Sequence, residues 1–144
     1  MPVRKASAVW AGGGIRAGKG TMSTESGMLA DARYHFGSRF ESEQGTNPEE
    51  LIAAAHAGCF SMALSGFLER AGHPPTRIAT EASCTVEKVE GGFKVTKMHL
   101  VTRATVPNAT AEQFAAAANT AKEGCPISGV MKGNVVVTLD AQLE

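Results

Sequence analysis

The chain has 144 residues, of which 43% are hydrophobic, and its 14 lysine and arginine residues balance its 14 aspartate and glutamate residues. This length predicts one domain, residues 1–144, with enough apolar material for a core. A net charge of zero without a basic run argues against nucleic acid as a partner. The N-terminus lacks the apolar stretch of a signal peptide, and no apolar run approaches the ~18 residues of a membrane span, so a cytoplasmic protein with no membrane partner is expected.

The N-terminal third is predicted to be extended. Residues 4–10 alternate in polarity, glycines at 12–14 interrupt them, and a second extended stretch covers residues 15–24, which together indicate a hairpin. No Lys-Ser or Lys-Thr follows the glycines at the spacing of a phosphate-binding loop, so we interpret them as a turn. A further short strand is predicted at residues 34–40, before a polar loop.

The clearest local signal is the start of a long helix. Asn47 is a typical N-cap, Pro48 suits the first helical position, and two glutamates follow in the first turn. The helix is predicted to run to Gly72, a natural stop. Because it is apolar on most faces, we expect it to be central and buried.

The C-terminal half predicts a mixture of strands and helices. A second hairpin is predicted from the strands at residues 77–89 and 93–105. A helix opened by a capping box follows at residues 110–122. Cys125 then precedes a short turn or helix, and the last strand covers residues 135–139. Antiparallel hairpins with helices grouped between them indicate an α+β fold. A long helix that is apolar nearly all round needs more cover than one sheet provides, which predicts a homodimer.

Three cysteines cannot all pair within one chain, so each is considered separately. Cys59 lies within the long helix with His56 one turn before it; both could be core residues, or His56 could be a polar neighbour of a functional thiol. Cys125 precedes a helix N-terminus, where free N–H groups would stabilise a thiolate, but it could equally serve only as a cap. Cys84, on an alternating strand, is predicted to lie in the core.

Two charged residues are further candidates. Glu50 is placed to complete the helix cap, which leaves Glu49 available for another role. A straight helix would separate Glu49 from Cys59 by about 15 Å along its axis, so a shared site would require an interrupted helix or a second chain. Arg39 is either a surface charge or a group that stabilises an anion. The four histidines are scattered and there is no Cys-x-x-Cys, so no metal site is expected.

Several segments together resemble the osmotically inducible protein C (OsmC) family, which is closely related to the organic hydroperoxide resistance (Ohr) proteins. The resemblance covers essentially the whole chain and is carried by Thr24-Glu25-Ser26-Gly27, Arg39-Phe40-Glu41, Gly45-Thr46-Asn47-Pro48-Glu49-Glu50-Leu51, His56-Ala57-Gly58-Cys59-Phe60-Ser61-Met62-Ala63-Leu64 and Gly124-Cys125-Pro126-Ile127-Ser128. It implies an α+β fold in which antiparallel sheets enclose central helices in an intertwined homodimer. It further implies a peroxidase without a bound cofactor or metal, acting in defence against oxidative and osmotic stress.

The resemblance also implies roles for individual residues. Cys59 would be the peroxidatic thiol and Cys125 the resolving one, which reverses the order that the helix terminus favours. Arg39 would stabilise the Cys59 thiolate and polarise the peroxide, with Glu49 orienting that arginine. Related subgroups supply the arginine from an earlier strand, where this chain has Arg16.

The chemistry that follows is the reduction of organic hydroperoxides to alcohols through a sulfenic acid and a transient disulfide. Apolar residues near the thiol, Phe40, Phe60 and Met62, would favour organic peroxides over hydrogen peroxide. A dithiol, such as that of a lipoyl-bearing protein, would serve as reductant. Two alternatives are a cysteine hydrolase with His56 as its base and a dimeric redox sensor or small-molecule binding protein without sustained turnover.

Overall fold

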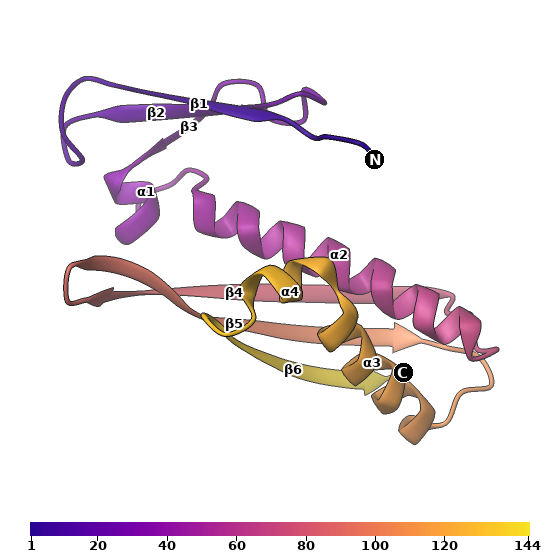
Figure 1. Ribbon diagram of the computed structural model, residues 1–144. Helices are drawn as coiled ribbons and strands as arrows, with labels where there is room; N and C mark the ends of the chain where they lie inside the picture. The colour runs from indigo at the N-terminus through magenta and orange to yellow at the C-terminus, as the bar shows by residue number, and fades with distance from the viewer. The chain divides into compact units, whose positions relative to one another are not determined.

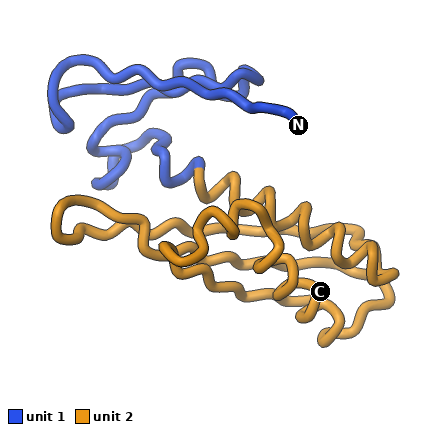
Figure 2. Tube along the Cα trace, viewed as in Figure 1, with its two compact units in different colours: residues 1–51 blue, residues 52–144 orange.

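The structure is a computed structural model that describes residues 1–144, and it contains two compact units. The first comprises Met1–Leu51 and the second Ile52–Glu144, drawn in blue and orange in Figure 2. Each unit contains one three-stranded sheet. That the whole chain forms a single domain remains a prediction.

The first unit is built on an antiparallel sheet with the strand order β1-β2-β3 (Figure 1). Its strands are β1 (Ala6–Ala11), β2 (Lys19–Thr24) and β3 (Ala32–His35). Strands β1 and β2 form the predicted hairpin. Gly12 and Gly13 in the connection have φ angles of 87° and 101°, a backbone region that glycine adopts without steric cost, so these glycines form a turn.

The strand predicted over residues 34–40 is wrong beyond His35, where the chain enters a short helix, α1 (Phe36–Phe40). Ser38 accounts for the change. Its hydroxyl accepts a hydrogen bond from the His35 N–H and donates one to the His35 carbonyl, each 3.0 Å long. Local bonds of this kind compete with strand pairing. As a result, Arg39 lies on a helix and not at the end of a strand.

The predicted long helix is present as α2 (Pro48–Arg70), and it is unbroken. Asn47 caps it, because its Oδ1 accepts a 2.7 Å hydrogen bond from the N–H of Glu50. The Glu50 carboxylate accepts a 3.4 Å bond from the Thr46 hydroxyl instead of returning one to the Asn47 backbone. Gly72, with a φ of 82°, follows the last turn and ends the helix as predicted.

The second unit contains a sheet with the order β4-β5-β6, made of β4 (Arg77–Val89), β5 (Gly92–Thr105) and β6 (Val136–Leu143). The β4–β5 hairpin is antiparallel as predicted. The expectation of wholly antiparallel sheets is corrected at one edge, because β6 runs parallel to β5. The chain between them forms two helices, α3 (Ala111–Gly124) and α4 (Pro126–Met131), and a connection of that length permits a parallel return.

The core of the second unit lies between its sheet and helices α2, α3 and α4, which cover one face of the sheet (Figure 1). Large side chains from α2, α3 and the sheet are buried there, and each contributes roughly 1.5–3 kcal/mol through removal of apolar surface from water. The fully buried members of this core include Phe60, Leu64, Leu68, Leu100 and Phe114.

Helix α2 is long and apolar enough, by length and composition alone, to cross a membrane. A helix from the core of a folded domain satisfies the same test. In this chain Phe60, Leu64 and Leu68 on α2 are completely buried in the core of the second unit. That packing accounts for one face of the helix. Only 28% of its apolar stretch is buried within this chain, so the predicted burial on most faces is not found here.

Candidate active site

Two thiols meet in the second unit. Cys59 lies in the middle of α2 and Cys125 lies between α3 and α4, and their Sγ atoms are 3.0 Å apart, with the Cys125 thiol donating towards Cys59. No disulfide joins them. Cys125 is only 1% exposed, whereas Cys59 is half-buried. A disulfide needs sulfur atoms about 2.05 Å apart, so the two thiols can be joined by a shift of about 1 Å.

Cys125 is held at the junction of two helices. Its N–H donates a 2.9 Å hydrogen bond to the carbonyl of Ala121, which closes α3, and its carbonyl accepts a 3.0 Å bond from the N–H of Gly129 in α4. Pro126 follows as the first residue of α4, where its fixed φ suits the helix. The position of this sulfur therefore depends on where both helices pack.

The surroundings of Cys59 within the second unit favour its protonated form. Burial raises the pKa of the Cys59 thiol, and the neighbouring Cys125 raises it further through the shared hydrogen bond and the repulsion between two sulfur charges. The backbone N–H of Ile127 acts in the opposite direction by hydrogen bonding to the sulfur. At neutral pH a nucleophilic thiolate at Cys59 thus needs an additional source of positive potential.

The contact from Ile127 changes the interpretation of the α4 terminus. The sequence left two interpretations of Cys125 open: its thiolate is stabilised by the free N–H groups at this terminus, or the residue serves only as a cap. The side chain of Cys125 makes no capping hydrogen bond, and the N–H of Ile127 serves the sulfur of Cys59 on α2. The helix terminus therefore assists the thiol on the neighbouring helix.

His56 lies one turn before Cys59 and is completely buried. Its Nε2 is 2.8 Å from the hydroxyl oxygen of Ser128, and its Nδ1 has no hydrogen-bond partner. Burial lowers the pKa of this imidazole, so it is neutral at physiological pH. A Cys-His hydrolase requires its histidine within hydrogen-bonding reach of its cysteine. Here His56 contacts a serine and Cys59 contacts a second cysteine, so that arrangement is not formed.

The buried histidine should make stability depend on pH. The unfolded chain binds a proton at His56 near the ordinary pKa of 6.5, whereas the folded chain resists protonation, so stability should fall as the pH drops below about 6.5. The slope for one proton is at most about 1.4 kcal/mol per pH unit. Thermal unfolding from pH 7.5 to 5 should show a steeper loss of Tm for the native chain than for His56→Gln. Parallel curves for the two proteins would contradict this expectation, since the other histidines are common to both.

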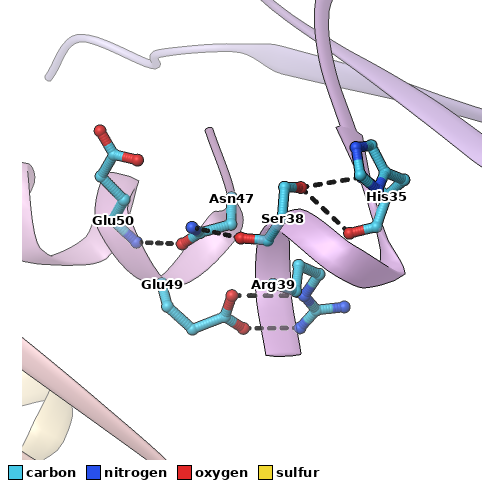
Figure 3. A network of polar contacts seen from close by, with 6 residues as sticks. All are labelled: His35, Ser38, Arg39, Asn47, Glu49 and Glu50. Atoms are coloured by element: carbon cyan, nitrogen blue, oxygen red, sulfur yellow. Dashed lines mark hydrogen bonds and ion pairs between the residues drawn. The ribbon is translucent and has the colours of Figure 1, made fainter. Parts of the chain in front are cut away.

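Arg39 and Glu49 meet in the first unit (Figure 3). The guanidinium binds the carboxylate through two hydrogen bonds, Nη2 to Oε1 at 2.6 Å and Nε to Oε2 at 3.2 Å. The Glu49 side chain is 12% exposed and that of Arg39 is 30% exposed. Such a two-point contact fixes both the plane and the direction of the guanidinium. The remaining donors of Arg39 are thereby held in one orientation.

A small hydrogen-bond network supports this pair by joining α1 to the start of α2 (Figure 3). The side-chain amide of Asn47 donates a 2.9 Å bond to the carbonyl of Ser38, while its oxygen caps α2. Ser38 in turn bonds to His35 through its hydroxyl. Arg39 is the residue after Ser38, and Glu49 lies two residues after Asn47. The network therefore fixes the backbone next to both charged side chains. Sequence analysis identified the cap but missed Ser38 as its partner.

The alternative arginine, Arg16, has a different setting in the same unit. Its side chain is 75% exposed, its guanidinium lies 4.2 Å from the centre of the Phe36 ring, and it is 3.9 Å from the carboxylate of Glu41. It lines a cleft of about 690 Å³ to which neither Arg39 nor Glu49 contributes.

Across the chain, no group of three or more histidine, cysteine or acidic side chains is arranged to hold a metal ion.

The apolar residues named from the sequence occupy different environments. Phe60 is fully buried in the core, while Met62 is 81% exposed and borders a shallow hollow over α2 and β4. Phe40, on α1, is half-buried, and the guanidinium of Arg39 lies 4.8 Å from the centre of its ring. Cys84, which was predicted to lie in the core, is half-buried on β4 and does not belong to the core cluster. The structure thus brings Cys59 and Cys125 together in one unit, and Arg39 and Glu49 together in the other.

The family profile described as OsmC-like protein matches residues 41–140. This chain belongs to the OsmC family. It is 51% identical to Peroxiredoxin OsmC of Escherichia coli (strain K12) over 141 residues, which cover 98% of this chain and 96% of that protein. It is 33% identical to the organic hydroperoxide resistance protein OhrB of Bacillus subtilis (strain 168) over 101 residues, covering 69% of this chain and 72% of the relative.

Solved structures of OsmC and Ohr proteins share this fold. The crystal structure of OhrB from Bacillus subtilis has a TM-score of 0.70 at 29% identity and covers 96% of this chain and 98% of its own. The structure of an organic hydroperoxide resistance protein from Elizabethkingia anophelis has a TM-score of 0.76 at 25% identity. The match covers 100% of this chain and 98% of that protein. The α+β architecture expected from the OsmC resemblance is therefore confirmed.

Proposed function

We propose that this chain reduces organic hydroperoxides to alcohols with Cys59 as the peroxidatic thiol and Cys125 as the resolving thiol. Membership of the OsmC family, together with relatives named as a peroxiredoxin and as organic hydroperoxide resistance proteins, supports a peroxidase role in hydroperoxide defence. The observation that carries the two-cysteine mechanism is the 3.0 Å separation of the two sulfur atoms. The redox-sensor alternative has no separate observation in its favour.

The chemistry balances without a bound cofactor. The Cys59 thiolate attacks the terminal peroxide oxygen, the O–O bond breaks, and the alkoxide takes up a proton and leaves as an alcohol. The resulting Cys59 sulfenic acid then reacts with the Cys125 thiol, which forms a disulfide and releases water. A dithiol reductant regenerates both thiols and is itself oxidised to a disulfide. We propose a lipoyl-type dithiol as this reductant.

Arg39 would supply the positive charge that the Cys59 thiolate needs. Burial and Cys125 raise the pKa of Cys59, so without a nearby cation the nucleophile would be scarce at neutral pH. Arg39 is always charged, and its guanidinium is oriented by two hydrogen bonds to Glu49. In this proposal Arg39 stabilises the thiolate and polarises the peroxide, while Glu49 keeps the guanidinium in place.

We assign the preference for organic peroxides to apolar side chains. Met62 has an exposed thioether, Phe40 has a half-buried ring beside Arg39, and both could contact an alkyl or aryl group of the peroxide. Phe60, being fully buried, would contribute by packing behind Cys59. Equal kcat/KM values for cumene hydroperoxide and hydrogen peroxide would remove this part of the proposal.

A homodimer is part of the proposal. Helix α2 exposes a row of apolar and small residues at intervals of three or four, with Ile52 38% and Met62 81% exposed and Ala55 and Gly58 between them. The helix is also unbroken, and ten helical residues advance about 15 Å, so it separates Glu49 from Cys59 along its axis. A second chain packed on this row would cover it and could supply the arginine pair. We further propose a cytoplasmic location.

The decisive variant for this mechanism is Cys125→Ser. With cumene hydroperoxide and excess dihydrolipoamide, the native chain should turn over continuously, whereas Cys125→Ser should consume about one equivalent of peroxide per chain and then slow sharply. The physical reason is that the Cys59 sulfenic acid has lost its adjacent resolving thiol. Stopped-flow measurement of peroxide loss, with dimedone trapping of the sulfenic acid, checks both parts.

The third cysteine provides the control. Cys84→Ser should retain native turnover and should still form one disulfide per chain on oxidation. If Cys125→Ser turns over like the native chain, the resolving role of Cys125 is wrong. If the native chain consumes only one equivalent in the presence of dithiol, the redox sensor without sustained turnover replaces the peroxidase.

A further inference from the structure

Two contacts join helix α2 to α4 and to its N-cap, Cys125. One is the Cys59–Cys125 sulfur pair at 3.0 Å, and the other is the hydrogen bond between His56 Nε2 and Ser128 Oγ at 2.8 Å. His56 and Cys59 are three positions apart, as are Cys125 and Ser128, and three residues make nearly one helical turn. Because the earlier residue on α2 contacts the later one on the α4 side, the two helices run in opposite directions. The His56–Ser128 bond therefore lies about one helical turn from the thiols.

The His56–Ser128 bond is well protected. His56 is 0% exposed and Ser128 is 7% exposed, so water does not compete effectively for either group. Because Nδ1 of His56 has no partner, the serine hydroxyl is the only polar contact that the imidazole makes. Removing that hydroxyl would leave both ring nitrogens buried without hydrogen bonds, a costly state that the surrounding structure would relieve by shifting.

Helix α4 needs such an anchor. It has only six residues, Pro126–Met131, and a helix of that length has little stability of its own. Its place depends on contacts with neighbouring elements, and Cys125 moves with it because this residue is its N-cap. The sulfurs must approach by about 1 Å to bond, so a displacement of α4 of similar size would decide whether the bond can form.

We propose that His56 and Ser128 are positioning residues for the resolving step, holding α4 so that the Cys125 thiol stays within reach of the Cys59 sulfenic acid. This inference rests on the proposed two-cysteine function. In that step the Cys125 sulfur attacks the Cys59 sulfur, the S–O bond breaks, and the leaving hydroxide takes the Cys125 proton to form water. The competing step is attack of the sulfenic acid on a second peroxide, which yields a sulfinic acid and another alcohol.

The test is Ser128→Ala under single-turnover conditions with cumene hydroperoxide. Formation of the Cys59 sulfenic acid should stay within about twofold of the native rate, whereas disulfide formation should slow by about tenfold or more, in keeping with the cost of misplacing a reacting group by 1 Å. With excess peroxide, mass spectrometry should show more sulfinic acid at Cys59. Ser128→Thr, which keeps the hydroxyl, should restore the native rate of disulfide formation.

The matched control is Thr138→Val. Thr138 makes a similar 2.7 Å contact with a histidine, His99, between β5 and β6 in the same unit, and its loss should leave both steps at native rates. If Ser128→Ala does not fold, His56→Gln and His56→Leu provide the comparison, because glutamine can still bond to Ser128 and should resolve faster than leucine.

Equal rates of disulfide formation in the native chain and in Ser128→Ala would overturn the inference while leaving the two-cysteine function intact. Equal slowing by Ser128→Ala and Thr138→Val would also overturn it, because the effect would then be one of general packing. Failure of the native chain to form the Cys59–Cys125 disulfide would instead refute the proposed function, and the inference with it.

Discussion

Replacing Cys59 with serine is expected to abolish peroxide reduction, with a loss of about 1,000-fold or more in kcat/KM for cumene hydroperoxide. A serine hydroxyl does not ionise near neutral pH and is a far weaker nucleophile towards a peroxide oxygen than a thiolate. The variant should remain folded, since the change replaces one half-buried sulfur with an oxygen. Peroxide loss measured with excess dithiol, beside a thermal melt, checks both expectations.

Cys84→Ser is the matched control for this experiment. It removes a half-buried thiol from the same unit without touching either sulfur of the pair, and it should keep native activity. Substantial activity in Cys59→Ser would show that a different group attacks the peroxide. Activity that survives in Cys59→Ser but is lost in Cys84→Ser would transfer the peroxidatic role to Cys84.

Replacing Arg39 with alanine is expected to lower kcat/KM at pH 7 by about 10- to 100-fold and to move the pH profile of peroxide reduction to higher pH. A cation near a thiolate lowers the thiol pKa by stabilising the charged form, so its removal leaves the raised pKa that burial and Cys125 impose on Cys59. Activity should then recover partly as the pH rises. Arg103→Ala, which removes the 3.4 Å ion pair with Asp140, should leave the profile unchanged.

A mixing experiment determines which chain supplies the arginine. If Arg39 serves the thiol of a partner chain, a dimer of Arg39→Ala with Cys59→Ser contains one intact site. Random mixing of these two impaired variants should then restore about a quarter of native activity. If Arg39 serves its own chain, no mixed dimer has an intact site and activity stays at the level of the separate variants. No recovery after mixing would therefore contradict the two-chain proposal.

The features that follow from local rules were predictable from the sequence. The cap at Asn47, the glycine stop at Gly72, the capping box at Thr110 and the β4–β5 hairpin all depend on residues adjacent in the chain, and the structure confirms each of them. The strand predicted through Phe40 failed because a single hydroxyl, that of Ser38, favours a helical turn. The parallel direction of β6 also escaped prediction, since strand pairing is decided by tertiary packing and not by the strand's own residues.

The sequence indicated candidate site residues but not their arrangement in space. Family motifs identified the two cysteines and the Arg39–Glu49 pair, yet composition alone could not separate a reactive Cys59 from an inert core cysteine. Cys59 and Cys125 are 66 positions apart, with a hairpin and a helix between them, and only folding brings the sulfurs to 3.0 Å. The contact between Ser128 and His56 gave no local signal, because a serine in a short helix can make many different contacts and this histidine lies 72 positions away.

The unequal exposure of the two sulfurs has a consequence for the direction of reduction. Once the disulfide has formed, an incoming dithiol can approach the half-buried sulfur of Cys59 far more readily than that of Cys125, which is 1% exposed. Exchange should therefore produce a mixed disulfide on Cys59 and expel Cys125 as the leaving group, with its sulfur remaining inside the protein. In the proposed cycle, access would thus decide which sulfur the reductant attacks, and the reductant would need to recognise only the Cys59 side of the bond.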